Sequence, residues 1–153
     1  MALPIKKADL DCLSIAHVPA IQVSPDSTVL EAVELTLPAK LGAVAVVEDG
    51  QLIGIFTERD VMLKVVHARR DPAKTRVREV MTAPVISIPK LMPRLEVLNL
   101  MLTHRIRHLP IAEDGKTVLG MLSVLDVLQQ VVEDLTIDLQ HMEAFLGADN
   151  PGG

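Results

Sequence analysis

The chain contains two copies of one motif, and this internal repeat constrains the fold more than any other feature of its 153 residues. The segment EDGQLIGIFTERDVMLKVV, which begins at Glu48, recurs as EDGKTVLGMLSVLDVLQQVV from Glu113. Gly54 matches Gly120 and Asp60 matches Asp126, both with an offset of 66 residues. A repeat of this size cannot bury both faces of a small sheet by itself. We therefore expect the two copies to pack on each other.

The repeat boundaries follow from how far the match extends. The offset is 65 at Gly50 and Gly115 and 64 at Pro25 and Pro89, so the length differences fall in turns and near a helix start. The expected units are a first repeat over 17–66, a linker over 67–80, a second repeat over 81–132 and a C-terminal amphipathic helix over 133–147. Basic residues gather in the linker, but acidic residues interrupt them, which favours a solvated segment.

The sequence pattern of each repeat predicts the secondary-structure order strand, helix, strand, strand, helix. A β-branched segment ends before a proline, at 21–24 and 85–88, and an amphipathic run follows it. Two short apolar strands then flank an Asp-Gly turn, which is typical of a hairpin, and a second helix begins at Thr57 or Ser123. The predicted fold is α/β, of the α+β type, with two strand-helix-strand-strand-helix repeats packed about a pseudo-twofold axis.

The first helix of each repeat has apolar residues at helical spacing. They are Val29, Val33 and Leu37 in the first copy and Leu95, Leu98 and Leu102 in the second. Because Met101 adds to the second set, we expect that helix to carry a broad apolar stripe and to be well buried.

The strand-to-helix junction, which occurs twice, is the best candidate for chemistry. Thr57 or Ser123 can cap the helix, and the acid three residues later, Asp60 or Asp126, lies on its first turn. There an acid can accept both hydroxyls of a ribose. The competing interpretation is a capping box, in which hydroxyl and acid only satisfy backbone N–H groups.

The segment HRIRHLPI from His104 brings basic residues to the start of a strand. Alternation along a strand predicts that Arg105 and Arg107 point to one side and His108 to the other. A phosphate clamp and a solvated strand end are both open interpretations. The first copy has Gly42 and Ala43 where Arg107 and His108 stand, so the two copies are chemically unequal.

Composition excludes several classes of function. The formal net charge of -5 argues against nucleic-acid binding, and a chain with two Phe and no Trp or Tyr lacks stacking platforms for single strands. No apolar stretch approaches the roughly 20 residues of a membrane span, and no secretory signal is visible, so we expect a cytoplasmic protein. A single cysteine, Cys12, fits a reducing compartment. Neither a metal-ligand set nor a catalytic motif is present, so an enzyme is not expected.

The C-terminal segment carries a further apolar stripe. Leu135, Leu139, Met142 and Leu146 recur at spacings of four, three and four. The helix that they predict can fold back on its own chain or contact a second subunit.

Together these residues resemble the cystathionine-beta-synthase-type (CBS) domain. The resemblance rests on GIFTERD and GMLSVLD at the two junctions, on MTAPVISIP at the start of the second repeat and on the RIRHLPI strand, and it covers about 17–132. It implies a regulatory module, usually dimeric, with clefts between the repeats for AMP, ADP, ATP, S-adenosylmethionine or NAD as a regulatory ligand, none of them tightly bound.

The resemblance also implies site residues, with the acid of one repeat facing strands of the other. One cleft would combine Ile55, Thr57, Asp60, Val85, Ile86, Arg107 and His108. The other would combine Ala20, Ile21, Gly42, Ala43, Met121, Ser123 and Asp126. The first repeat lacks the Met-Thr opening and the basic pair of RIRHLPI, which weakens the case for the second cleft. The alternative function is a structural dimerisation module with empty clefts. The effector protein that such a module would regulate is unknown.

Overall fold

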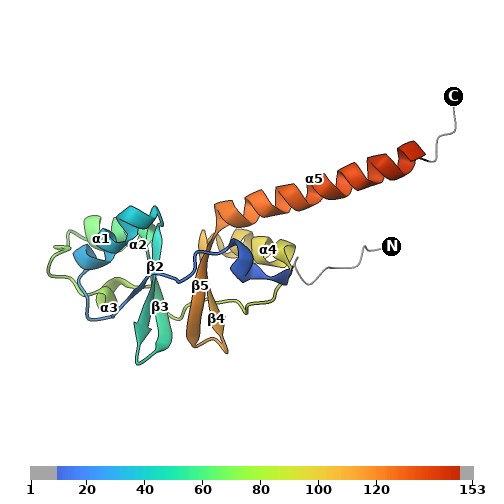
Figure 1. Cartoon of the computed structure of the whole chain (residues 1–153). Helices are drawn as coiled ribbons and strands as arrows, with labels where there is room; N and C mark the ends of the chain where they lie inside the picture. Colours follow the sequence, from blue (N-terminus) through green and yellow to red (C-terminus); the bar gives the residue numbers. More distant parts are fainter. Residues whose placement is uncertain (1–9, 149–153) are drawn as a thin grey trace.

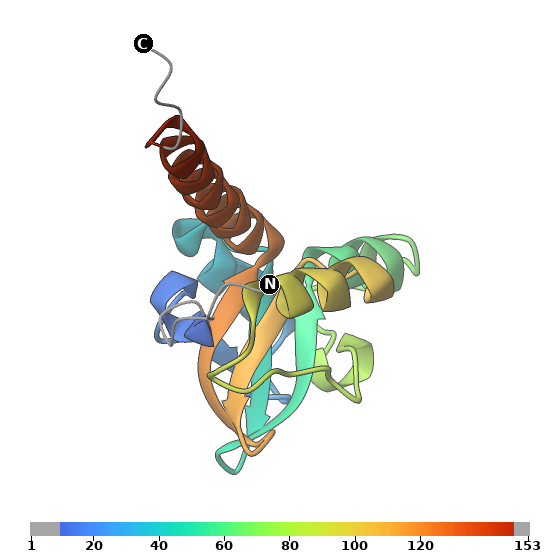
Figure 2. The same cartoon turned by 90° about the vertical axis from the view of Figure 1, so that its right-hand side faces the viewer.

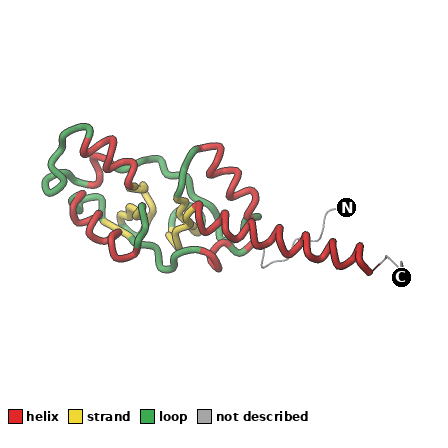
Figure 3. Tube along the Cα trace, turned by 90° about the horizontal axis from the view of Figure 1, so that it is seen from above, coloured by secondary structure: helices red, strands yellow, loops and turns green. Residues whose placement is uncertain are grey.

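The computed structural model describes residues 10–148, which form two repeats whose sheets lie side by side at the centre of the molecule (Figure 1). Seen from above, the strands lie in the middle and helices flank them on both sides (Figure 3). This arrangement confirms the predicted mixed fold of two repeats.

The first repeat is built on a three-stranded sheet in the order β1-β2-β3. The strands are β1 (Gln22–Val23), β2 (Ala43–Glu48) and β3 (Gln51–Thr57), with β1 parallel and β3 antiparallel to β2. The helix α1 (Val29–Ala39) joins β1 to β2, while α2 (Glu58–Asp60) continues as the π-helix η3 (Val61–Val66). The order strand, helix, strand, strand, helix is therefore present as predicted.

The second repeat has an antiparallel pair of strands, β4 (His108–Glu113) and β5 (Thr117–Ser123). Its helices are α4 (Arg94–His104) and α5 (Val124–Ala148). The strand expected at 85–88 is reduced to one parallel bridge between Ile88 and Ile111. In the first repeat the N–H of Ala45 donates to Ile21 across the equivalent ladder, at 2.9 Å. The equivalent residue, Pro110, has no N–H to donate, which shortens the pairing.

Both hairpins turn at the predicted Asp-Gly pairs. Asp49 and Gly50 have φ angles of 52° and 75°, and Asp114 and Gly115 have 51° and 67°. Two consecutive residues with positive φ are characteristic of the tight turns that match the twist of antiparallel strands. Glycine and aspartate tolerate this conformation, so the sequence identifies both turns.

The segments that lead into the two repeats are exchanged between them. Thr82, at the start of the second repeat, forms an isolated bridge to Ile55 on β3, and His17, at the start of the first, forms one to Met121 on β5. Gly54 permits the first approach, because a Cβ there would lie 3.0 Å from the Thr82 carbonyl oxygen. Each repeat therefore contributes a strand-like edge to its neighbour's sheet.

Three apolar clusters form the core, one in each repeat and one between them. The central cluster joins the two sheets through apolar side chains, four of them alanines: Ala20, Ala43, Ala45, Leu52, Ile55, Ala112 and Met121. The 67–80 segment differs from the solvated linker that was expected. Residues 67–74 are exposed, whereas Val77 and Val80 of the short helix α3 (Val77–Val80) are buried in the core of the first repeat.

The expectation that α4 is well buried along a broad stripe is wrong. Val97 and Met101 are buried, whereas Leu95 and Leu102 are exposed. In α1, likewise, Val29 is buried and Leu37 is exposed. Apolar residues occur around most of each helix, so periodicity alone could not identify the side that faces the sheet.

The separate C-terminal helix expected over 133–147 is the second half of α5. This helix runs without interruption for 25 residues, Val124–Ala148, because neither glycine nor proline occurs before Gly147. Its second half extends away from both repeats, as two perpendicular views show (Figures 1 and 2).

Candidate functional site

The junction of β3 and α2 forms a capping box. The side chain of Thr57 accepts a hydrogen bond from the Asp60 N–H at 3.3 Å, and the Asp60 carboxylate accepts one from the Thr57 N–H at 3.0 Å. Two backbone donors of the helix start are thereby satisfied. The competing interpretation of this motif as a helix cap is correct for the geometry.

Asp60 has further partners that reach it from other parts of the chain. Its Oδ1 accepts a hydrogen bond from the Thr82 hydroxyl at 2.9 Å and forms an ion pair with Lys64 Nζ at 2.9 Å. The residue is only 5% exposed. A buried carboxylate requires such partners, because an unpaired charge away from water is costly. Asp60 thus ties the helix start to the segment exchanged from the second repeat.

A cavity of about 810 Å³ opens beside this junction, between the two repeats. The first repeat lines it from β3 through η3, and the second lines it with Thr82 and with the turn that leads into β4. Its lining residues are Ile55, Thr57, Glu58, Arg59, Asp60, Met62, Leu63, Lys64, Thr82, Arg105, Ile106, Arg107 and His108. Five of the seven residues predicted for this cleft are among them: Ile55, Thr57, Asp60, Arg107 and His108. Hereafter it is the Asp60 cleft.

The remaining two predicted residues lie elsewhere. Val85 packs against the central apolar cluster, and Ile86 is partly exposed without lining the cavity.

Four cationic side chains line the Asp60 cleft: Arg59, Lys64, Arg105 and Arg107. The prediction that strand alternation separates Arg105 and Arg107 from His108 is wrong. Arg105 ends α4 in the left-handed conformation, with a φ of 53°, and β4 begins only at His108. The chain therefore turns through this segment, and all three side chains reach the same cavity. Such a cavity can hold a ligand with several negative charges.

Burial lowers the pKa of His108 below its usual value of about 6.5. The Glu58 and Asp126 carboxylates act in the opposite direction, while His17 and Arg107 add to the lowering. The imidazole is therefore mainly neutral at pH 7.

The depressed pKa of His108 makes stability depend on pH. The unfolded chain binds this proton more readily than the folded one, so protonation favours unfolding as the pH falls below about 6.5. We expect the melting temperature to fall less between pH 7.5 and pH 5.5 in His108→Gln than in the wild type. Thermal melts at the two pH values test this, with the exposed His141→Gln as control. An identical loss in His108→Gln and wild type would contradict the assignment.

The equivalent junction in the second repeat has different partners. The Ser123 hydroxyl donates to Asp126 Oδ2 at 2.7 Å, and His17 Nε2 lies 3.2 Å from the same oxygen. His17 replaces Thr82 here, because it leads into the first repeat as Thr82 leads into the second. The Asp126 side chain is 38% exposed, whereas that of Asp60 is 7% exposed.

The other residues predicted for the second cleft lie mainly in the core. Ala20, Ala43 and Met121 belong to the central cluster, and Ile21 packs against the core of the first repeat. Gly42 is covered by a side chain, since a Cβ there would lie 2.8 Å from the Glu58 carboxyl carbon. Gly42 is the counterpart of Arg107. The acidic side chain of Glu58 therefore covers the position at which the second repeat has a cation.

The charge around the two junctions differs strongly. The counterparts of Arg59, Lys64, Arg105 and Arg107 are Leu125, Gln130, Lys40 and Gly42. Backbone geometry supports this alignment, because Lys40 and Arg105 have the same φ of 53°, and the carbonyls of Gly42 and Arg107 each accept a helix-start N–H at 2.8 Å. Four cations in the Asp60 cleft thus correspond to one around Asp126.

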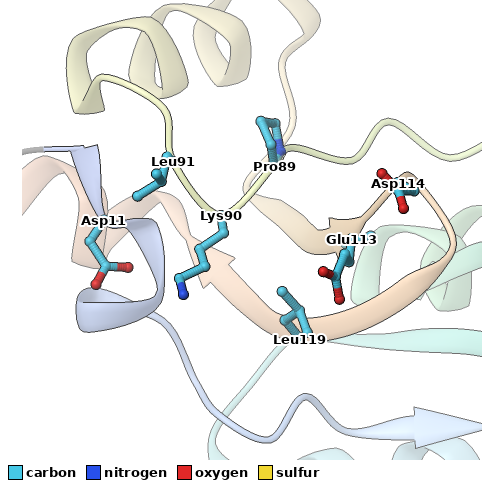
Figure 4. Close-up of a pocket in the computed structure, with 8 residues that line it drawn as sticks. Asp11, Pro89, Lys90, Leu91, Glu113, Asp114 and Leu119 are labelled. Carbon is cyan, nitrogen blue, oxygen red and sulfur yellow. The ribbon is translucent and has the colours of Figure 1, made fainter. Parts of the chain in front are cut away.

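A second groove, of about 720 Å³, lies on the second repeat between the N-terminal segment and the β4–β5 hairpin (Figure 4). Asp11, Lys90, Glu113 and Asp114 give it mixed charge. In the first repeat, Arg78 forms ion pairs with Asp26 and with Glu48, the counterpart of Glu113. None of the predicted site residues lines this groove.

Sequence reasoning missed Arg59, Lys64 and Thr82 as residues of the Asp60 cleft. Lys64 lies four residues after Asp60 on the helix, a spacing that favours an ion pair and could have identified it. Thr82 reaches Asp60 only through the exchanged segment, which no local pattern reveals.

Within residues 10–148, no group of three or more His, Cys, Asp or Glu side chains is placed to hold a metal ion. In the same range, no helix has the length and apolar content needed to cross a membrane.

Comparison with known sequences identifies relatives throughout most of the chain. The CBS domain-containing protein CBSX3, mitochondrial, of Arabidopsis thaliana is 35% identical over 126 residues, which are 79% of this chain and 61% of that relative. The chain therefore spans less than two thirds of that protein's length.

Solved structures show the same arrangement. A protein with CBS domains from Burkholderia ambifaria is 36% identical and superposes with a TM-score of 0.70, covering 75% of this chain and 84% of that one. The CBS domain pair of protein MJ0100, solved with 5'-methylthioadenosine and S-adenosyl-L-methionine, superposes with a TM-score of 0.73 over 86% of this chain and 99% of that one. At 23% identity, the latter supports the fold alone.

The sequence profile of the CBS domain matches the chain twice, at residues 14–67 and 77–133. These two stretches contain the two strand-to-helix junctions and the segments exchanged between the repeats. The chain belongs to the CBS-domain family and carries a tandem pair of CBS domains.

Proposed function

We propose that this CBS pair is a regulatory module that binds an adenosine-derived ligand in the Asp60 cleft, with the phosphates held by the four cations. The observation that carries the proposal is the convergence of Arg59, Lys64, Arg105 and Arg107 on one cavity between the repeats. Multiple cations around a cavity favour multiply charged anions. Among the expected ligands, AMP, ADP and ATP therefore fit better than S-adenosylmethionine, whose sulfonium is positive.

The ribose position is proposed at the helix start. Thr57 and Asp60 both line the cavity, but the Asp60 carboxylate is engaged by Lys64 and Thr82. A ribose hydroxyl that donates to Asp60 would compete with these partners. Lys64 is the partner that can leave, because its side chain is 42% exposed and can reach a phosphate instead. When a nucleotide binds, Lys64 would then leave the Asp60 carboxylate and pair with a phosphate of the ligand.

A structural dimerisation module with empty clefts is the second candidate. The observation in its favour is that Asp60 already takes part in a capping box and in an ion pair with the half-exposed Lys64, so the carboxylate has a structural role. This alternative predicts no response to adenine compounds. We propose no catalytic activity for this chain. The CBS pair of protein MJ0100, which this chain matches in fold, was solved with small-molecule ligands bound.

A thermal-shift screen separates these candidates. An adenine nucleotide at about a hundred times its dissociation constant should add roughly 2.7 kcal/mol to the free energy of unfolding, or about 5 to 10 degrees in melting temperature. The panel compares ATP, ADP, AMP, adenosine, S-adenosylmethionine, NAD, GTP and CTP. Equal shifts for all nucleotides, or no shift for any, would argue against an adenine-specific cleft.

The remaining expectations for the protein's context are also proposals. We propose a cytoplasmic homodimer that passes the ligand signal to an effector protein of unknown identity, with no nucleic acid as partner. The mitochondrial name of the Arabidopsis relative makes the compartment a point to test. Fluorescent tagging of the protein in its native cell would locate it.

A further inference from the structure

Half of α5 lies outside the folded body of the protein. The ion pair between Arg94 and Asp134, at 3.0 Å, connects the middle of the helix to α4. From Leu135 to Gly147 every residue is exposed. At 1.5 Å per residue, the 25 residues of α5 form a rod of about 37 Å, and its outer half projects away from both repeats (Figures 1 and 2).

An unbroken heptad pattern of apolar residues follows this rod. Alternating spacings of three and four place them at consecutive a and d positions: Leu125, Leu128, Val132, Leu135, Leu139, Met142 and Leu146. All seven side chains, hereafter the α5 seam, are exposed, by 44% to 72%. Such a pattern sustained over three heptads is characteristic of a coiled coil.

The α5 seam is not the face with which the helix packs on its own repeat. That inner face consists of Val127 and Val131, both buried in the core of the second repeat. Along the helix, the same face continues as Asp134, Asp138 and His141. It is polar at these three positions, where the helix leaves the body, and becomes apolar again only at the exposed Phe145, whereas the seam is apolar at every position. The projecting half is therefore suited to a partner helix rather than to its own repeat.

A second copy of the same helix matches the seam when it runs antiparallel. With the twofold axis at the level of Ile137, six of the seven seam residues face one another, an a residue of one copy opposite a d residue of the second, and Leu125 lies beyond these layers. The layers pair Leu128 with Leu146, Val132 with Met142, and Leu135 with Leu139, and each layer occurs twice by symmetry. Six apolar layers are filled without a polar residue among them.

Charge favours the antiparallel over the parallel orientation. In a parallel pair, Asp138 at position g would face Glu143 at position e of the second copy, on both sides of the seam. In the antiparallel pair, Glu143 faces Gln129, and only Asp138 meets its own copy. The number of like-charge contacts falls from two to one.

We infer that α5 joins two copies of this chain through an antiparallel, two-stranded coiled coil along the α5 seam. The inference specifies the interface of the proposed homodimer and does not depend on nucleotide binding. It places the two CBS pairs at opposite ends of the paired helices.

Sedimentation equilibrium of the full chain, at tens of micromolar, tests the interface. Leu135→Glu with Leu139→Glu puts four carboxylates into the central layers and should weaken self-association by about a hundredfold or more. The matched control, Gln140→Glu with Ala144→Glu, adds the same charge to other faces of the same helix and should associate like the wild type. Circular dichroism verifies that all three proteins are folded. A monomeric wild type, or equal association of seam variant and control, would overturn the inference.

Cysteine crosslinking tests the orientation. A Leu135→Cys copy mixed with a mass-tagged Leu139→Cys copy should form mainly the mixed disulfide, because these positions face each other only in the antiparallel pair. Disulfides between identical copies would overturn that orientation. The native Cys12 is buried, so the wild type serves as the uncrosslinked control. A nucleotide-induced thermal shift measured on the seam variant tests the Asp60 cleft separately from the interface.

Discussion

Arg107→Ala is expected to weaken the binding of AMP by about ten- to a hundredfold, since a charge-assisted hydrogen bond contributes roughly 1.5 to 3 kcal/mol. Arg107 lines the Asp60 cleft just before β4, and its carbonyl, which the substitution retains, accepts the N–H of Val124 at 2.8 Å. The side chain is exposed, so its removal should leave the fold intact. The loss should therefore appear in affinity rather than in stability.

Titration calorimetry with AMP on the wild type and two variants measures this effect. Lys40→Ala is the matched control, because Lys40 is the counterpart of Arg105 in the other repeat and does not line the Asp60 cleft. Its affinity for AMP should equal that of the wild type. If Lys40→Ala weakened AMP as much as Arg107→Ala, the phosphate site would have to be placed elsewhere.

The repeat made most of the fold predictable from the sequence. Matching Gly54 to Gly120 and Asp60 to Asp126 gave the element order, and the two Asp-Gly turns located both hairpins. These features are local, because a turn or a helix start depends on a few consecutive residues. The family resemblance, and not a local pattern, placed Ile55, Thr57, Asp60, Arg107 and His108 in one cleft, and all five line one cavity.

What the sequence could not supply depends on contacts between distant segments. The approach of Thr82 to Asp60 results from the exchange of the lead-in segments, and the turn at Arg105 results from how α4 ends. The outward position of Leu95 and Leu102 depends on which side of α4 meets the sheet. Helical periodicity permits several sides when apolar residues are abundant, so packing makes the choice.

Asp60→Ala should lower the free energy of unfolding by about 2 to 3 kcal/mol, which corresponds to roughly 5 to 10 degrees in melting temperature. The substitution removes a helix cap, the acceptor of the Thr82 hydroxyl and the ion pair of Lys64, which keeps only its longer hydrogen bonds to Met81 and Thr82. This structural cost makes Asp60→Ala an unsuitable probe of ribose binding. Asp60→Asn, which keeps an oxygen for the same donors, should lose less stability.

Asp126→Ala provides the pseudo-symmetric control for this prediction. Its carboxylate meets Ser123 and a half-exposed His17, and water can replace these partners, so we expect a loss of only about 1 kcal/mol. Chemical denaturation of the ligand-free proteins gives both values. Equal losses for Asp60→Ala and Asp126→Ala would show that the contacts of Asp60 with Thr82 and Lys64 add no stability. In that case, the exchange of the lead-in segments would be held by the backbone bridges and by the central apolar cluster alone.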